Sequence, residues 1–478
     1  MSKTMNVGSG SVKIRMYKQG FGDCFLIAFP GRDEKPKHVL IDCGVHHKDK
    51  DNKKKMTLTA ESIKEATDGH LELVVVTHEH TDHIDGFKLA EPVFKDMTME
   101  NVWMGWTENY DDPRVKALDK TLDIYLAALR ILRDDMKSSR TSLWEMLDNL
   151  LGFYAEELGA AGRMSNRETM KWLHKMGGPG MKFCSPGELL TLEGLDGVSF
   201  FVLGPPLLDK YLKKSAPSKG AGKETYLTDP ENAHLEDFAL EVIRSGADKK
   251  GVACAADVGE TLSGRYPFED RYRIPVGEAK DRAHSVFDEY LSTKNDWRRI
   301  DNKWREMAEE LALKLDDHTN NTSLALAIEI GKGGKVLLFP ADGQVGNWLS
   351  WGDLKWKRGR RELTIDNLLE RTVLYKVGHH GSHNATLKSN GLEKMSHPEL
   401  TAMLPVDEDF AKSVNWKRIP FPDLLERLRV KCCSRVLRSD KPIPRQKDRP
   451  YNLGKKEWRD FIGRISETES FIELTIAL

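Results

Sequence analysis

The sequence predicts a protein of the α/β or α+β class, with strands and helices alternating along the chain. Three observations favour this class. The first 45 residues have the alternating apolar pattern of paired strands separated by short polar turns. Several short apolar runs farther along are typical of strands buried on both faces. Stretches with apolar residues at helical spacing lie between these runs, and no internal repeat is visible.

The first strands are expected at 12–17, 24–29 and 38–41, with a glycine-rich turn between the first two. A helix at 60–66 precedes the apolar run 71–76, which we expect to be a buried strand. Later strands are expected at 189–192, 198–203, 323–330, 335–339 and 372–377. These strands are spread over most of the chain, so we treat 1–478 as one domain that carries insertions.

Two insertions and a basic C-terminal region account for the remaining length. Residues 106–175 form a helical insertion, in which Asp112 and Pro113 provide the cap and first position of a helix. Residues 207–320 form an irregular and helical insertion. We expect residues 386–478 to complete the fold. A stripe in the second insertion is more typical of a core than of a surface that docks a protein partner: Trp297, Ile300, Trp304, Met307 and Leu311.

Composition excludes several classes of protein. With 39% hydrophobic and 31% charged residues the chain is neither a disordered polar chain nor a collagen-like one. Its 73 basic and 74 acidic side chains leave a net charge of −1, which argues against a uniformly basic nucleic-acid coat. The six cysteines fit neither a zinc knuckle nor a disulfide framework, and we interpret them as buried thiols. No apolar run approaches the ~18 residues of a spanning helix, and no signal peptide is apparent, so we expect a cytoplasmic protein without membrane contact.

Six of the 15 histidines lie in two short clusters, each directly after an expected buried strand. The first cluster is THEHTDH at 77–83, which contains His78, His80, Asp82 and His83. The second is HHGSH at 379–383, and Asp342 follows the strand that lies between them in sequence. Loops at strand ends are where α/β proteins place their functional residues. Imidazole and carboxylate groups suit zinc, iron or manganese, so we predict a metal site.

The two clusters and their surroundings resemble those of the metallo-β-lactamase fold. The pattern His-x-His-x-Asp-His after an apolar strand is the signature of that fold. Further motifs run in the order seen in hydrolases similar to the soluble domain of the ComEC/Rec2 competence protein. These motifs are QGFGDC at 19–24, LIDCG at 40–44, NTSL at 321–324, LLFPAD at 337–342 and KVGHHGS at 376–382. The resemblance implies an αββα sandwich with metal ions at the edge of the sheets.

The resemblance also assigns roles to individual residues. His78 and His80 would bind one metal ion. Asp82, His83 and His379 would bind a second, and Asp342 would bridge the two ions. His379 is preferred to His380 as the ligand because it follows the strand end more directly. Asp42 would stabilise the loop that carries the ligands without binding a metal itself, and Asp23 would hold the glycine-rich turn. The ions would be one or two divalent metals, with zinc as the first expectation and manganese as the alternative.

One position departs from the family's pattern. Many relatives carry a further metal-binding histidine where this chain has Gly204, which cannot bind a metal. The first ion would then have few protein ligands. His234, His284 or His318 of the second insertion would have to supply the missing ligand, although such a histidine more often lies at the surface.

Such a site is expected to catalyse hydrolysis by water whose pKa the metal lowers. Asp82 would orient that water, His380 would give a proton or hydrogen bond to the leaving oxygen, and Ser382 and His383 would face the substrate. The resemblance implies phosphodiester cleavage, with DNA or another nucleic acid as the substrate. The stretch 411–464 has 16 basic and 6 acidic residues, and such a stripe could follow a phosphate backbone or be a solvated surface.

Two other functions remain open at this point. The same metals could hydrolyse a small ester, lactone or nucleotide without help from the basic stretch. Alternatively, the chain could be a partner-regulated effector of a bacterial defence or toxin system, with its helical insertions docking a protein. Salt-sensitive DNA binding, turnover of a small ester, or inactivity until a partner is added would distinguish the three functions.

Overall fold

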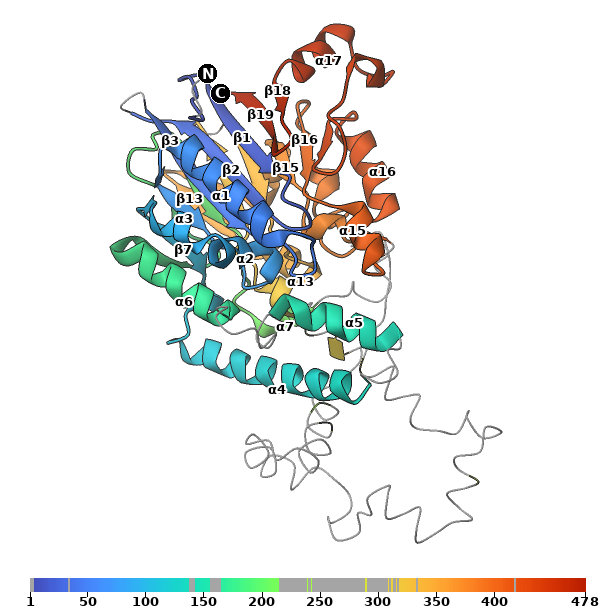
Figure 1. Cartoon of the computed structure of the whole chain (residues 1–478). Coiled ribbons are helices and arrows are strands. Elements are labelled where there is room, and N and C mark those ends of the chain that lie inside the picture. Colours follow the sequence, from blue (N-terminus) through green and yellow to red (C-terminus); the bar gives the residue numbers. More distant parts are fainter. Residues whose placement is uncertain are drawn as a thin grey trace. The chain divides into compact units, whose positions relative to one another are not determined.

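The computed structural model describes residues 4–32, 35–136, 142–154, 165–214, 318–331, 334–416 and 418–478, with isolated positions between 239 and 315. The chain forms two compact units. Unit 1 comprises Met1–Val115, Gly152–Glu231 and Asp316–Leu478, and unit 2 comprises Lys116–Leu151 and Asn232–Leu315. Both large β-sheets lie in unit 1, and Figure 1 labels several of their strands.

The first sheet has eight strands in the order β18-β19-β1-β2-β3-β5-β7-β8. Neighbours from β18 to β3 are antiparallel, whereas those from β3 to β8 are parallel. The first and last long strands, β1 and β19, pair along their whole length and lie side by side in Figure 1. The strands are β1 (Ser11–Tyr17), β2 (Cys24–Pro30), β3 (Pro36–Cys43), β5 (Leu73–Val75), β7 (Val102–Gly105), β8 (Met181–Cys184), β18 (Ile465–Glu467) and β19 (Phe471–Ala477).

The second sheet has seven strands in the order β17-β16-β15-β12-β11-β10-β9. Its strands from β12 to β17 are parallel, and those from β9 to β12 are antiparallel. They are β9 (Leu189–Leu190), β10 (Val198–Val202), β11 (Leu326–Ile330), β12 (Lys335–Phe339), β15 (Thr372–Lys376), β16 (Thr401–Leu404) and β17 (Val436–Arg438). Two short pairs complete the β-structure: β4 (His70–Leu71) with β6 (Thr98–Met99), and β13 (Lys355–Arg358) with β14 (Arg361–Thr364).

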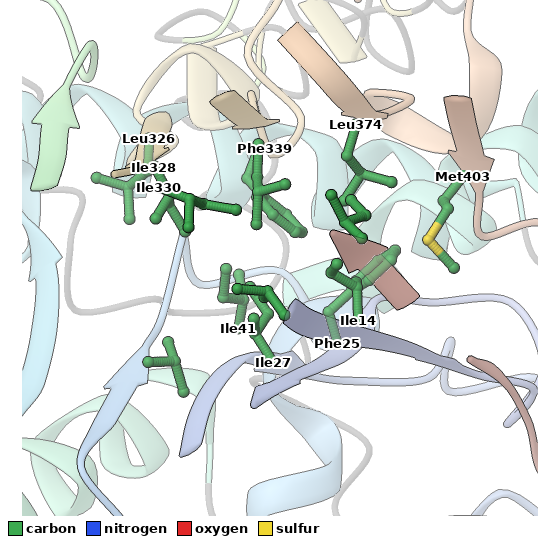
Figure 2. Close-up of a cluster of buried hydrophobic side chains, with 14 of the residues drawn as sticks. Ile14, Phe25, Ile27, Ile41, Leu326, Ile328, Ile330, Phe339, Leu374 and Met403 are labelled. Atoms are coloured by element: carbon green, nitrogen blue, oxygen red, sulfur yellow. The ribbon is translucent and has the colours of Figure 1, made fainter. Parts of the chain in front are cut away.

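The two sheets pack face to face through apolar side chains. Figure 2 shows Ile14, Phe25 and Ile27 of the first sheet opposite Phe339 and Leu374 of the second. Each of these side chains is nearly or fully buried. Alternate residues of a strand point to opposite faces of the sheet. The remaining apolar residues of the same strands therefore face outward, and other elements must pack over them to bury them.

Helices provide that cover on both outer faces. Leu26, Leu40 and Val74 share a core with Met56 of α1 (Asn52–Thr67) and Phe87 of α2 (Thr81–Leu89). α3 (Glu91–Lys95) and α6 (Asn166–Gly177) add to the same core. The outer face of the second sheet packs on α13 (Val345–Ser350), α14 (Ile365–Glu370), α15 (Glu408–Ser413) and α16 (Pro422–Lys431). Unit 1 is therefore layered helix–sheet–sheet–helix.

The remaining helices belong to shorter segments and to unit 2. In unit 1, α7 (Asp209–Leu212) precedes the undescribed part of the second insertion, and α17 (Lys455–Ile462) lies between β17 and β18. α4 (Pro113–Asp135) and α5 (Ser142–Leu151) supply most of the described residues of unit 2. Within the described ranges, no helix is both long enough and apolar enough to cross a membrane.

The predicted mixed α/β class is confirmed, and most predicted strands lie within two or three residues of observed ones. The observed helix α1 is longer than the helix predicted at 60–66. It begins at Asn52, in a lysine-rich segment whose lack of apolar periodicity gave no sign of a helix. β7, β8 and β16 to β19 were missed, since several are only three or four residues long and show no clear alternation. Of the predicted apolar stripe only Leu311, which is buried, lies among the described residues.

Buried neutral histidines should make this fold sensitive to acid. Burial lowers the pKa of the His38 imidazole in β3 from 6.5 to about 4, and its Nε2 lies 3.3 Å from the Met5 carbonyl oxygen. The neutral ring therefore stabilises the folded chain above pH 6.5, and this contribution is lost as the pH falls toward 4. Between pH 7 and pH 5 we expect His38→Gln to lose about 2 kcal/mol less free energy of unfolding than the wild type. Urea unfolding at the two pH values measures this difference, and equal losses would contradict the assignment.

Candidate metal centre

The candidate site is assembled where parallel strands of both sheets end. In the first sheet, Asp42 lies near the end of β3, and the segment 77–83 follows β5 into α2. In the second sheet, Asp342 follows β12, and His380 follows β15 in the short helix η7 (His379–Gly381). β3 pairs in parallel with β5, and β12 with β15, so the carboxyl ends within each pair meet at one edge. Face-to-face packing of the sheets then brings the two edges together.

Four side chains form the centre of this site: Asp82, His83, Asp342 and His380. Each is at most 1% exposed, and one ligand atom from each lies within 4.8 Å of all the others. His83 Nε2 is 3.1 Å from Asp342 Oδ2, and His380 Nε2 is 2.8 Å from Asp82 Oδ2. Two imidazoles and two carboxylates converging at this range form a ligand set that suits zinc or manganese.

The outward-facing nitrogens of both imidazoles have partners in the protein. His83 Nδ1 lies 2.8 Å from Asp42 Oδ2, and His380 Nδ1 lies 2.8 Å from the Pro405 carbonyl oxygen. Asp42 in turn accepts hydrogen bonds from the backbone N–H and the hydroxyl of Thr77, both at 2.8 Å. A carboxylate or carbonyl on the outer nitrogen fixes the ring and directs Nε2 toward a metal. Asp42 thus contacts Thr77 and His83, two residues of the loop that the resemblance expects it to support.

His78 and His80 form a second convergent pair beside the first group. His78 Nε2 and His80 Nδ1 are 3.1 Å apart, and both rings are buried. The Oγ of Ser323 and Oγ1 of Thr77 lie 3.3 and 3.1 Å from the other nitrogen of His78. Burial is the main reason that the pKa of His78 lies well below its usual range and that of His80 falls to about 4. Both rings are therefore neutral at pH 7 and able to bind a metal without losing a proton.

His380, and not His379, belongs to the four-residue group. Its Nδ1 has the backbone partner that a metal-binding histidine commonly has, and its Nε2 faces Asp82. His379 donates its backbone N–H to Asp342 Oδ1 at 3.1 Å, and within the described residues its Nδ1 has no hydrogen-bond partner. The sequence-based preference for His379 rested on its distance from the strand end. The observed contacts favour His380 as the ligand.

The electrostatics of the group favour a bound cation. Burial by itself lowers the pKa of the His83 imidazole, but Asp342, Asp82 and other nearby carboxylates outweigh it and hold that pKa well above its usual value. Burial raises the pKa of the Asp342 carboxyl, but His83 and Lys376 together bring it well below its usual value. The carboxylates therefore stay ionised, and without a metal a protonated imidazole balances part of their charge.

Three buried polar atoms in or beside the group make no well-aligned hydrogen bond among the described residues, although His83 Nε2 lies 3.1 Å from Asp342 Oδ2. These atoms are His83 Nε2, Asp82 Oδ1 and His80 Nε2. A buried polar atom without a partner is costly, and native proteins rarely leave several together. A divalent cation held between these side chains would satisfy at least the first two. The residues present therefore fit a metal ion, as the sequence predicted.

The backbone around the group is held in unusual conformations. Asp42, Ala341 and His380 have φ values of 56°, 52° and 50°, in the left-handed region that non-glycine residues seldom adopt. Such residues cluster at functional sites, where the surrounding contacts hold them in place. A Cβ at Gly44 would overlap the backbone of Asp82, which explains the glycine that follows Asp42 and Cys43.

Gly204 stands next to Asn347 rather than beside a metal ligand. A Cβ at this position would overlap the side-chain amide of Asn347. That amide donates to the carbonyl oxygens of Asn321 and Ser323 at 3.1 and 3.0 Å, and it accepts from Trp351 Nε1 at 2.9 Å. The space next to Gly204 is thus used to tie the NTSL segment to α13. Three histidines of the second insertion were considered as replacement ligands. The charges that act on His318 are those of Lys213 and Asp209, and His234 and His284 lie outside the described residues.

This contact yields a stability prediction. Gly204→Ala should lower the free energy of unfolding by about 1–3 kcal/mol, because the new methyl group displaces the Asn347 amide. Gly352→Ala is the matched control, since a Cβ there meets nothing within 4 Å. Denaturant unfolding compares the two variants. Equal stability of both would show that Asn347 does not depend on the glycine.

Two predicted substrate-binding residues lie farther along the second loop. Ser382 Oγ donates to Asn384 Oδ1 at 2.9 Å, and the His383 ring lies 5.9 Å from the Phe421 ring. Their role in substrate binding remains a prediction.

Sequence reasoning missed Lys376, which is 1% exposed and forms ion pairs with Asp23 and Asp342. A lysine inside an apolar strand was the available signal, because buried lysines usually need a charged partner.

Comparison with protein-family models gives no match, and a search of curated proteins gives none either.

Proposed function

We propose that the chain is a metal-dependent hydrolase with a metallo-β-lactamase-like fold, and that it cleaves phosphodiesters. The observation that carries this proposal is the buried group of Asp82, His83, Asp342 and His380. The adjacent His78–His80 pair and the support from Asp42 add to it. The order of the sequence motifs along the chain agrees with the same assignment.

The protein's own residues would hold and orient the reacting groups. Asp82, His83, Asp342 and His380 would hold one divalent ion, and His78 and His80, with Asp342, could contribute to a second. When bound, such an ion polarises a phosphoryl oxygen and lowers the pKa of water. Asp42 keeps the His83 ring in place, and the Pro405 carbonyl does the same for His380. Lys376 holds Asp342 from the side away from His83, because it contacts Oδ1 while His83 contacts Oδ2.

Nucleic acid is the proposed substrate class, and exposed basic residues support it. Lys447, Lys455, Lys456 and Arg459 are exposed on or beside α17, and within the described residues they have no ion pair. Charges of this kind bind phosphate groups independently of sequence. A DNA affinity that falls steeply with salt would support this substrate class.

A small phosphodiester is the second candidate, and ion pairing in the C-terminal region favours it. Arg427 pairs with Glu393, Arg438 with Asp440 and Arg464 with Glu399. Lys412 also pairs with Glu408. Several of these acidic partners lie before residue 411, so the basic excess of the stretch 411–464 is partly neutralised in the fold. DNA binding that is weak at every salt concentration, with turnover of a small diester, would favour this candidate.

Cleavage assays with an inactive control test the proposal. The substrates are single- and double-stranded DNA, RNA and the small diester bis(p-nitrophenyl) phosphate, each with Zn²⁺, Mn²⁺ or Mg²⁺. We expect cleavage of at least one substrate by the wild type and none by Asp82→Ala, because Asp82 supplies a carboxylate to the metal group. Equal product from both proteins, or none from the wild type with any metal, would refute it.

A further inference from the structure

His46 lies beside the candidate metal centre in a cage of aromatic rings. Its ring is fully buried, and it packs against Phe153, Phe410 and Trp416 at centroid distances of 4.8, 5.1 and 5.4 Å. Phe21 completes the cage at 6.4 Å. The four rings come from three segments, at Phe21, at Phe153 and at 410–416, and all of them belong to unit 1.

Two rings of the cage also contact proposed metal ligands. Phe21 also contacts the His380 ring, with centroids 4.0 Å apart, and Phe153 contacts the His80 ring at 5.2 Å. The His46 imidazole also interacts electrostatically with Asp82 and His380. One intervening ring therefore links His46 to each half of the centre, and His46 does not belong to the four-residue metal group.

One nitrogen of His46 is satisfied and the other is not. Nδ1 accepts the backbone N–H of Lys48 at 3.2 Å, so in the neutral ring the proton is on Nε2. Nε2 is buried and has no hydrogen-bond partner among the described residues. The Phe and Trp rings cannot accept this hydrogen bond in the way a carbonyl or carboxylate would. The imidazole of His47 lies closer, at a centroid distance of 4.4 Å, but His46 Nε2 makes no hydrogen bond to it. His46 Nε2 is therefore a buried donor beside the candidate metal centre that lacks an acceptor among the described residues.

We propose that His46 is a further catalytic residue, whose Nε2–H donates a hydrogen bond to a phosphoryl oxygen of the substrate. This inference rests on the proposed function, and it adds an oxyanion-binding group to the metal centre. The aromatic cage fixes the ring before substrate arrives, so the donor is preorganised for the charge that develops on that oxygen. His46 stays neutral and donates a hydrogen bond without giving up its proton, since burial holds the pKa of its imidazole well below the usual value.

A pair of variants separates the hydrogen bond from the packing. His46→Phe keeps a ring in the cage and removes the donor, whereas His46→Gln places an amide N–H near the position of Nε2. For a phosphodiester that the wild type cleaves, we expect kcat to fall by about 100-fold in His46→Phe with little change in KM. His46→Gln should recover most of the loss. Both variants should keep the wild-type zinc content, because His46 is not one of the metal ligands.

Binding of inorganic phosphate to the zinc-loaded protein provides a readout that does not depend on turnover. Isothermal titration should show at least about tenfold weaker phosphate binding in His46→Phe and near-normal binding in His46→Gln. If phosphate binds this way but the wild type cleaves no phosphodiester, the proposed function fails and the oxyanion site stands. Wild-type kcat and phosphate affinity in His46→Phe would overturn the inference, as would a wild type that does not bind phosphate. Equal losses in both variants would also overturn it, because they would indicate packing alone.

Discussion

Asp342→Ala is expected to abolish metal binding and to lower the rate of hydrolysis by about a thousandfold. Asp342 is 1% exposed, and its two oxygens contact different partners, His83 Nε2 and Lys376 Nζ. It is also the carboxylate that links the second sheet to the segment 77–83 of the first. Its loss removes a ligand and leaves Lys376 with Asp23 as its remaining carboxylate partner. A bound metal supplies several kcal/mol of transition-state stabilisation, and each 1.4 kcal/mol is worth about tenfold in rate.

Metal content by mass spectrometry and the cleavage rate together measure the effect of Asp342→Ala. Asp366→Ala is the matched control, because Asp366 is half exposed on α14 and pairs with Lys394 at 2.6 Å. The control should keep both metal and activity. An Asp342→Ala protein that is folded and binds zinc as tightly as the wild type would show that the ion binds elsewhere.

Lys376→Met is expected to cost about 3–5 kcal/mol of unfolding free energy in the metal-free protein. Lys376 is 1% exposed, lies 3.2 Å from Asp342 Oδ1, pairs with Asp23 and donates to the Ala341 carbonyl at 3.1 Å. Burial alone would lower the pKa of its ammonium group, but Asp23 and Asp342 raise it, so the lysine stays charged. Replacing it with an apolar side chain leaves two buried carboxylates without their cation.

Denaturant unfolding of the metal-free protein measures this cost. Lys412→Met is the control, because Lys412 is exposed on α15 and its ion pair with Glu408 should be worth at most about 1 kcal/mol. Adding Asp23→Asn to Lys376→Met should recover part of the loss, since one uncompensated charge is removed. A cost no larger than that of the control would mean that water reaches Lys376.

The local part of the site could be predicted from the sequence. His78, His80, Asp82 and His83 follow one buried strand within six positions, so their proximity is set by the chain itself. The supporting role of Asp42 was implied by the family resemblance, and its carboxylate contacts His83. The mixed class followed from short apolar runs, because strands buried on both faces carry a strong signal even when their order in the sheet is unknown.

The rest depended on contacts between distant segments. The choice between His379 and His380 is set by backbone torsions in η7, where both residues have positive φ, and no residue pattern encodes that. The cage around His46 combines Phe21, Phe153 and the 410–416 segment, which are far apart in sequence. The basic C-terminal stretch is partly neutralised by acidic residues that precede it, so its net charge overstated the free positive charge.

X-ray absorption at the zinc edge of the zinc-loaded protein tests the metal centre most directly. If the ion binds at Asp82, His83, Asp342 and His380, the spectrum will show only nitrogen and oxygen ligands at about 2.0–2.2 Å, with the outer-shell signature of imidazole. Sulfur at about 2.3 Å would place the ion at cysteines instead and would contradict the account.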